Sequence, residues 1–315
     1  MNPHVLLAEL GLDRLRERVA ATPPHGFGLR VPRAFVARMR AGDPQDPLLR
    51  QVLPLDAENR VVSGFGMDPV GDLAARATVG DGVLHKYAGR ALLVATGSCA
   101  VHCRYCFRRH FPYADETAAR DRWAATLEFL RQRPDIDEVI LSGGDPLSLS
   151  TQKLAELTHG LRELPWITTL RIHTRLPVVL PARIDAELVD WLSRIELSKV
   201  VVIHANHAQE FDREVDQALQ RLRDADCVLL NQSVLLRGVN DSVQALADLS
   251  RRLLRCGVVP YYLHALDPVA GSAHFAVDDA RAIELLGQLR TSLPGYLVPR
   301  LVREVPGESS KSPVT

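Results

Sequence analysis

The chain has 315 residues, of which 38 are basic and 38 acidic, so its formal net charge is zero. Balanced charge disfavours a nucleic-acid-binding surface, and no apolar run approaches the ~20 residues of a membrane span. The N-terminal residues have the pattern of an amphipathic helix, and we expect no secretory leader there. Five cysteines, three of them clustered, do not make a disulfide framework. We therefore expect a cytoplasmic protein with neither nucleic-acid nor membrane partners.

The chain divides into three stretches. Residues 1–90 hold helical pieces broken by proline-rich segments, and we expect them to form an N-terminal helical cap. Over 91–295, apolar runs alternate with helical patterns, which predicts a parallel sheet wrapped by helices. Residues 296–315 form a C-terminal tail. The predicted strands are 91–96, 138–142, 168–173, 199–205, 227–233 and 258–264, and the predicted helices are 115–132, 151–163, 184–194, 208–223, 241–255 and 278–291.

Three cysteines follow the first predicted strand. Cys99, Cys103 and Cys106 have the spacing C-x3-C-x2-C. Three thiolates can hold three irons of a four-iron cluster and leave the fourth iron open for chemistry. The alternative is a structural zinc with His102 or His110 as fourth ligand, although the spacing fits a zinc knuckle poorly. In parallel α/β barrels, ligands bind where such loops lie, at the C-terminal ends of the strands.

The cysteine spacing, with Tyr105 before the last cysteine, resembles the radical S-adenosylmethionine (SAM) superfamily. In that superfamily SAM binds the open iron and one electron cleaves it to a hydrogen-abstracting radical. The resemblance implies a [4Fe–4S] cluster on Cys99, Cys103 and Cys106, and an external one-electron donor. It also implies a partial (β/α)6 barrel of the α/β class. The six predicted strand–helix units are too few for a closed eight-stranded barrel.

Longer stretches of the chain carry a second resemblance. They are HKYAGRALL (85–93), CAVHCRYCFRRHF (99–111), LSGGDPL (141–147), HTRLPVVLPARI (173–184), NQSVLLRGVND (231–241), PYYLHALDPVAGSAHF (260–275) and SSKSP (309–313). Together these stretches resemble the lysine 2,3-aminomutase family. The resemblance implies an isomerase that converts L-lysine to (R)-β-lysine with pyridoxal 5′-phosphate (PLP) as further cofactor. The short tail is most similar to the branch that makes β-lysine for elongation factor P, where a separate ligase takes over the product without a stable complex.

The family holds PLP as a Schiff base on a lysine near the C-terminus, which the resemblance places at Lys311. A Schiff base needs a primary amine, and lysines are scarce in this chain. Tyr87 and Arg90 align with the family's contacts to the PLP phosphate, for which an arginine fork is suited. The other three lysines are Lys86 in that same stretch, Lys153 in a helical pattern and Lys199 at the start of a predicted strand.

Further residues are assigned by the same resemblance. Gly143, Gly144 and Asp145 align with the contacts to the SAM amino group. Gln232 ends a predicted strand and faces the expected site, where contact with SAM and hydrogen bonding within the core are the two alternatives. For the substrate, Arg108 matches the position that pairs the carboxylate. Two acids, Asp267 and Glu304, match the positions that bind the amino group at the far end of lysine. For Glu304, a surface ion pair with Arg303 or Arg300 is the alternative.

Other functions remain open on the sequence. A free-standing aminomutase could make β-lysine or β-arginine for secondary metabolism. A radical SAM reaction without PLP would keep the cysteines but leave Lys311 without a task. An iron–sulfur electron carrier would hold a stable cluster and cleave no SAM.

Overall fold

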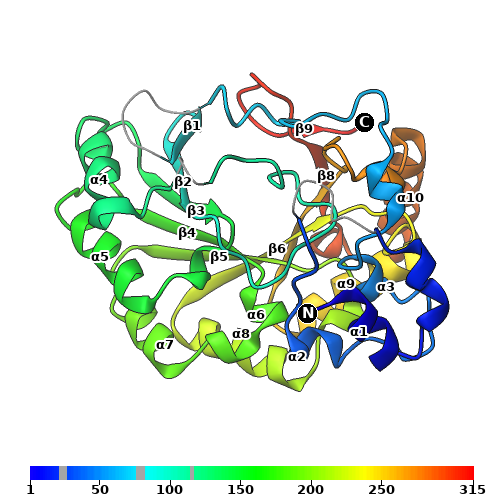
Figure 1. The fold of residues 1–315 in the computed structure, drawn as a ribbon. Coiled ribbons are helices and arrows are strands. Elements are labelled where there is room, and N and C mark those ends of the chain that lie inside the picture. The colour runs from blue at the N-terminus through cyan, green and yellow to red at the C-terminus, as the bar shows by residue number, and fades with distance from the viewer. Residues whose placement is uncertain (21–26, 76–81, 114–116) are drawn as a thin grey trace.

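The computed structural model describes residues 1–20, 27–75, 82–113 and 117–315. These residues form one nine-stranded sheet in which the strands lie side by side in chain order. Strands β2 to β8 run parallel, whereas β1 and β9 are antiparallel to their neighbours. Figure 1 shows the sheet curving into an open barrel with helices on its outer face. The strands are β1 Val83–Tyr87, β2 Arg90–Thr96, β3 Glu138–Gly143, β4 Thr169–Thr174, β5 Ser198–His204, β6 Cys227–Val234, β7 Val259–His264, β8 Arg300–Arg303 and β9 Ser312–Pro313.

From β2 to β8, helices connect the strands, and five of these connecting helices begin at a serine or aspartate. The side chain of each cap accepts a hydrogen bond from a backbone N–H in the first turn, which is worth about 1 kcal/mol per cap. These caps are Ser150, Asp185, Asp212, Ser242 and Asp278. The helices are α1 Pro3–Glu9, α2 Arg33–Val36, α3 Pro47–Arg50, α4 Ala124–Arg131, α5 Thr151–Leu161, α6 Leu176–Val179, α7 Ala186–Ser193, α8 Arg213–Asp224, α9 Val243–Arg255 and α10 Asp279–Ser292.

The partial barrel predicted from the sequence is confirmed. Strands β2 to β7 and the helices that follow them reproduce the six predicted units. The prediction for 115–132 was too long, because left-handed backbone at Asp121, Arg122 and Trp123 delays the start of α4. Its first two residues, 115 and 116, lie outside the described residues. Strands β1, β8 and β9 were not predicted.

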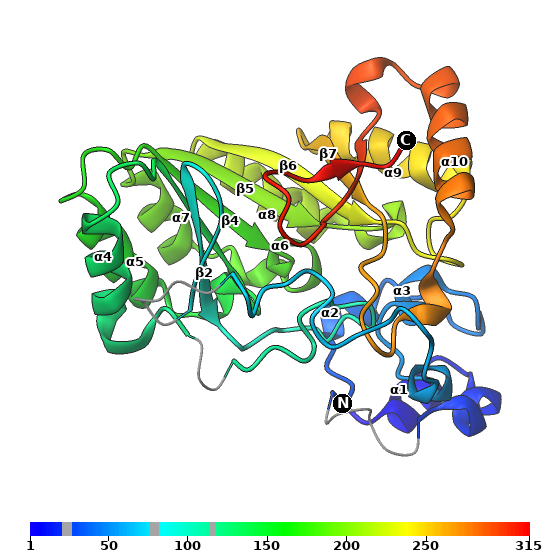
Figure 2. The same cartoon turned by 90° about the horizontal axis from the view of Figure 1, so that it is seen from above.

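The sheet extends on both sides of the 91–295 stretch. Strand β1 lies in the predicted cap and pairs with β2, while β8 and β9 lie in the predicted tail. The cap also shares the barrel's hydrophobic core, since Leu7, Phe35 and Leu48 belong to one buried cluster with the strand residues Val139 and Val201. In Figure 2 the N-terminal helices lie along one side of the barrel, far from α4 and α5.

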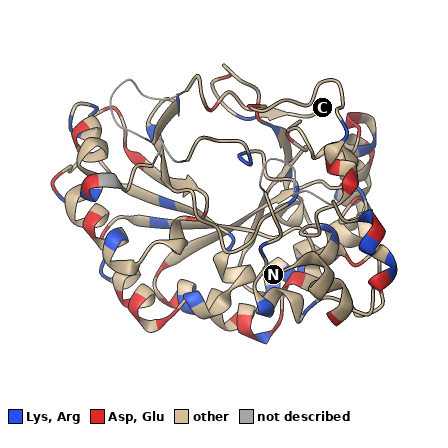
Figure 3. Ribbon diagram, viewed as in Figure 1, with Lys and Arg blue, Asp and Glu red and all other residues tan. Residues whose placement is uncertain are grey.

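Charged residues of both signs are mixed over the outer helices in Figure 3. Within the described residues, no helix is both long and apolar enough to cross a membrane.

Candidate active site

The three clustered cysteines lie in the loop that follows β2. All three are free and partly exposed. The backbone N–H of Cys106 donates to the carbonyl of Cys103 at 3.0 Å, which forms a tight turn. Burial and the neighbouring Cys103 raise the pKa of Cys106 to about 11, and burial and Cys106 raise the pKa of Cys99. One loop thus carries three free sulfur donors, which is the number that a cluster with one open iron requires.

The N-terminal cap holds the cysteine loop through a buried ion pair network. Glu58 accepts from Arg104 Nε at 2.8 Å and Nη2 at 2.6 Å, and from Arg109 Nη2 at 2.7 Å. All three side chains are fully buried. Arg104 also donates its backbone N–H to the carbonyl of Gln51 at 2.9 Å. Sequence reasoning missed Glu58.

The two histidines of the zinc alternative are both bonded to backbone carbonyls. His102 Nδ1 lies 2.8 Å from the Gly28 oxygen, and its ring stacks on Phe27 at 4.4 Å. His110 Nε2 lies 3.3 Å from the Ala270 oxygen. These contacts give both rings a role in covering the loop.

Gly143 and Gly144 allow the end of β3 to approach the cysteine loop. A Cβ at Gly143, whose φ is +109°, would lie 2.8 Å from the Thr96 oxygen, and one at Gly144 would lie 2.4 Å from the Ser98 oxygen. The backbone N–H groups of Gly144 and Asp145 donate to these same oxygens at 2.6 and 2.8 Å. The glycines therefore serve a close approach between two loops, and SAM contact at these positions stays a prediction.

The Asp145 carboxylate is engaged inside the protein. It accepts from Thr174 Oγ1 at 2.7 Å and from the N–H groups of Arg175 at 2.7 Å, Leu176 at 3.2 Å and Leu147 at 3.1 Å. Burial raises the pKa of Asp145, and these donors oppose the rise. The carboxylate ties the end of β3 to the end of β4, so a SAM ammonium would have to share it with four protein donors.

Gln232 lies near the end of β6, beside His204 in the sheet register. His204 Nε2 is 2.8 Å from the Tyr105 hydroxyl, which connects this strand end to the cysteine loop. The side-chain amide of Gln232 makes no hydrogen bond to the residues described, and this side chain is partly exposed. The position agrees with a ligand contact, which stays a prediction.

The β8–β9 hairpin brings Lys311 to Glu304. Val302 pairs with Pro313 and Arg303 with Ser312, so the same register places Glu304 opposite Lys311. Lys311 Nζ donates to Glu304 Oε2 at 2.6 Å. Burial alone would raise the pKa of Glu304, but the Lys311 ammonium and other donors lower it to about 2. The proposed surface ion pair of Glu304 is not formed with Arg303, which pairs with Asp279 at 2.6 Å.

Two residues of β1 reach the same carboxylate. Tyr87 donates its hydroxyl to Glu304 Oε1 at 2.6 Å, and Lys86 Nζ lies 3.4 Å from the same oxygen. Arg90, at the start of β2, lies over the Tyr87 ring at 5.4 Å. Of the predicted PLP residues, Tyr87 and Lys311 thus contact Glu304, and Arg90 contacts Tyr87.

Asp72, on the cap, links this group to Arg108. Its carboxylate lies 2.7 Å from Lys86 Nζ and 2.6 Å from Arg108 Nε. Arg108 Nη1 donates to Ser142 Oγ on β3 at 3.0 Å. Burial would raise the pKa of Asp72, but Arg108 and Lys86 lower it. Sequence reasoning missed Asp72, because nothing local distinguishes it from other acids of the cap.

Buried polar atoms without partners lie near Lys311. Asp267 Oδ1, His264 Nε2 and His173 Nε2 are buried and make no hydrogen bond within the described residues. Burial raises the pKa of Asp267 to about 7, against the opposing charge of Lys311. Burial and the Lys311 charge lower the pKa of His264 to about 3. Buried polar atoms are normally satisfied, so these atoms fit a polar ligand in the barrel.

An open parallel barrel with a three-cysteine loop after its first parallel strand defines a radical SAM enzyme, and residues 93–250 match the radical SAM superfamily model. An Escherichia coli (strain K12) protein, L-lysine 2,3-aminomutase, is 48% identical, over 99% of this chain and 91% of the relative. A Haemophilus influenzae protein of the same name is 44% identical, over 99% of this chain and 91% of the relative. The chain belongs to the lysine 2,3-aminomutase family.

The family membership makes the chain an isomerase, and the cofactors of the family are a [4Fe–4S] cluster, SAM and PLP. Among solved structures, a radical SAM methyltransferase from Sphaerobacter thermophilus has a TM-score of 0.50 at 17% identity, covering 70% of this chain and 68% of that chain. This likeness shows the fold alone.

Proposed function

We propose that the chain converts L-lysine to (R)-β-lysine by a 2,3-amino shift, using PLP held on Lys311 and an external one-electron donor. The observation that carries the proposal is the gathering of Lys311, Glu304, Tyr87 and Asp267 within one barrel that also holds the cysteine loop. The relatives from E. coli and H. influenzae, both named L-lysine 2,3-aminomutase, support the choice of lysine.

When bound, the cluster with SAM supplies a hydrogen-abstracting radical, and PLP supplies a conjugated system that stabilises the migrating nitrogen. Cys99, Cys103 and Cys106 hold three irons. Lys311 supplies the primary amine that anchors PLP. Glu304 fixes that amine at 2.6 Å, and the register of the β8–β9 hairpin fixes Glu304.

The phosphate of PLP needs positive charge and hydrogen-bond donors near Lys311. Tyr87 and Arg90 stand at adjacent strand ends. Arg90 supplies a guanidinium, and the Tyr87 hydroxyl would donate to the phosphate after it is released from Glu304. Lys86 lies beside them and adds a second cation. Arginine suits a phosphate because its fork donates two parallel hydrogen bonds.

Lysine presents a carboxylate and a cationic end, which require opposite charges in the protein. Arg108 is held by Asp72 at Nε and by Ser142 at Nη1, so its Nη2 is left for the substrate carboxylate. Asp267 has a buried oxygen to accept from the distal ammonium. Glu304, bound to Lys311, adds negative charge on the same side. Together these groups orient the lysine between Arg108 and Asp267.

We further propose that the β-lysine is transferred to elongation factor P by a separate ligase that takes up the free product. This destination rests on the resemblance of the segment around Lys311. The enzyme would work in the cytoplasm, because an oxygen-sensitive cluster requires a reducing compartment.

The test is an anaerobic assay. The protein is reconstituted with iron, sulfide and PLP, and then given SAM, dithionite and L-lysine or L-arginine, with products separated by chiral chromatography. We expect (R)-β-lysine from wild-type enzyme, none from Lys311→Ala, and an unchanged rate from Lys153→Ala, which changes a lysine on the outer helix α5. Cleavage of SAM without rearrangement of lysine would reject lysine as the substrate. β-Arginine as the main product would show that arginine is the substrate instead.

A further inference from the structure

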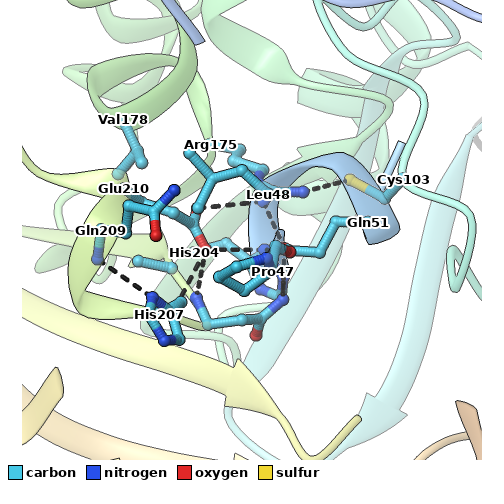
Figure 4. Close-up of polar contacts among 12 residues, drawn as sticks. Pro47, Leu48, Gln51, Cys103, Arg175, Val178, His204, His207, Gln209 and Glu210 are labelled. Atoms are coloured by element: carbon cyan, nitrogen blue, oxygen red, sulfur yellow. Dashed lines mark hydrogen bonds and ion pairs between the residues drawn. The ribbon is translucent and has the colours of Figure 1, made fainter. Parts of the chain in front are cut away.

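Arg175 is a buried arginine that directly contacts an iron–sulfur ligand. It follows β4, and its Nη1 lies 2.7 Å from Cys103 Sγ (Figure 4). The same nitrogen donates to the Tyr105 hydroxyl at 2.8 Å. Its backbone N–H donates to Asp145 at 2.7 Å, which fixes the main chain beside the cysteine loop. The aminomutase chemistry proposed above assigns no task to this side chain.

Two other segments fix the second terminal nitrogen of the guanidinium, Nη2. Its Nη2 donates to Gln51 Oε1 at 2.7 Å and to Glu210 Oε2 at 3.0 Å. Gln51 and Glu210 are fully buried. The other oxygen of Glu210 accepts from the backbone N–H groups of Asn206 at 2.8 Å and His207 at 3.1 Å, so the carboxylate cannot turn freely.

We propose that Arg175 is a positioning residue for the cluster, which donates a charge-assisted hydrogen bond to the Cys103 sulfur and thereby raises the reduction potential of the [4Fe–4S] centre. Hydrogen bonds to the sulfurs are one of the terms that set such potentials. They stabilise the reduced cluster more than the oxidised one, because the reduced cluster carries one more negative charge.

The geometry of the ion pair explains why the effect is directed at Cys103. Arg175 and Glu210 together are neutral. The Nη1 nitrogen of the guanidinium contacts the sulfur, whereas its Nη2 nitrogen contacts the carboxylate. In a buried site such an oriented pair acts strongly, because the effective dielectric constant is lower than in water. Gln51 adds a second acceptor at the far end of the guanidinium.

The test is a redox titration of the reconstituted full-length protein, without PLP or lysine. Reduced cluster is quantified by electron paramagnetic resonance in the wild type, Arg175→Met and Arg175→Lys. The control is Arg183→Met, which also removes one cation: Arg183 donates to the carbonyls of Leu147 and Leu149 at 2.8 and 3.1 Å and contacts no thiol. Iron and sulfide contents confirm that each variant holds a full cluster.

For Arg175→Met we expect at least a tenfold fall in the ratio of reduced to oxidised cluster at the wild-type midpoint, which is a shift of about 59 mV for a one-electron couple. Arg175→Lys keeps the charge without the fork and should shift in the same direction by less. Arg183→Met should titrate like the wild type.

A wild-type midpoint in Arg175→Met, or an equal shift in Arg183→Met, would overturn the proposal. If Arg175→Met does not retain a cluster, the midpoint of Arg175→Lys decides, and a wild-type value there rejects the role. Because the titration needs neither PLP nor lysine, its result is independent of the proposed aminomutase substrate.

Discussion

Asp267 should make lysine binding depend on pH near neutrality. Its Oδ1 is buried without a hydrogen-bond partner in the described residues, and burial raises its pKa to about 7 despite the opposing charge of Lys311. The difference from an ordinary aspartate, at 1.36 kcal/mol for each pKa unit, corresponds to about 4 kcal/mol. Burial therefore disfavours the charged carboxylate that a lysine ammonium requires.

The magnitude follows from the fraction of ionised Asp267. With a pKa of about 7, that fraction rises from about one-tenth at pH 6 to about nine-tenths at pH 8. Because the ammonium binds the ionised form, the affinity for lysine should fall about tenfold from pH 8 to pH 6. Asp267→Asn has no carboxylate to ionise, so it should bind lysine weakly at both values.

Isothermal titration calorimetry can measure this effect. L-lysine is titrated into reconstituted enzyme with SAM and an oxidised cluster, without reductant, at several pH values. The difference between the wild-type and Asp267→Asn pH profiles isolates Asp267 from the titration of lysine itself. If both proteins show the same pH dependence and similar affinities, Asp267 does not bind the substrate ammonium.

Two further substitutions test residues that the structure adds to the sequence analysis. Asp72→Asn should weaken lysine binding by about 1.5–3 kcal/mol, because it removes the charged acceptor that orients Arg108. Binding of cadaverine, which lacks the carboxylate, should not change, and an equal loss for both ligands would contradict this role. Glu58→Gln should lower the free energy of unfolding by about 3–5 kcal/mol, because it leaves buried Arg104 without its ion partner. The control is Glu9→Gln, which removes an acid from an exposed ion pair. Urea denaturation should give it a free energy of unfolding within about 0.5 kcal/mol of the wild type. Similar losses in both variants would reject the buried pair as a main support of the cysteine loop.

The repeated units and the cysteine loop were predictable because their signals are local. Each strand is a short apolar run, and caps such as Ser150 and Asp212 mark where the helices begin. Strands β8 and β9 were missed because they have only four and two residues, too few for a periodic pattern. Their pairing nevertheless decides the position of Lys311, since it sets Glu304 opposite the lysine.

Contacts between distant segments could not be predicted from the sequence. Glu58 meets Arg104 across 46 positions, and Gln51 meets Arg175 across 124. Asp145 shows the same limit, because the sequence did not reveal that Thr174 and the backbone of Arg175 donate hydrogen bonds to its carboxylate. Such partners are set by tertiary packing, which leaves no mark in the neighbouring residues.

Lys311, as the PLP anchor, is the residue on which the proposed activity depends most directly. The measurement is reduction of the PLP-loaded enzyme with borohydride, followed by digestion and mass spectrometry of the phosphopyridoxyl peptide. We predict that the label lies on Lys311, which is held 2.6 Å from Glu304. The neighbouring amine of Lys86, 3.4 Å from the same carboxylate group, is the competitor, and a label there would contradict the account.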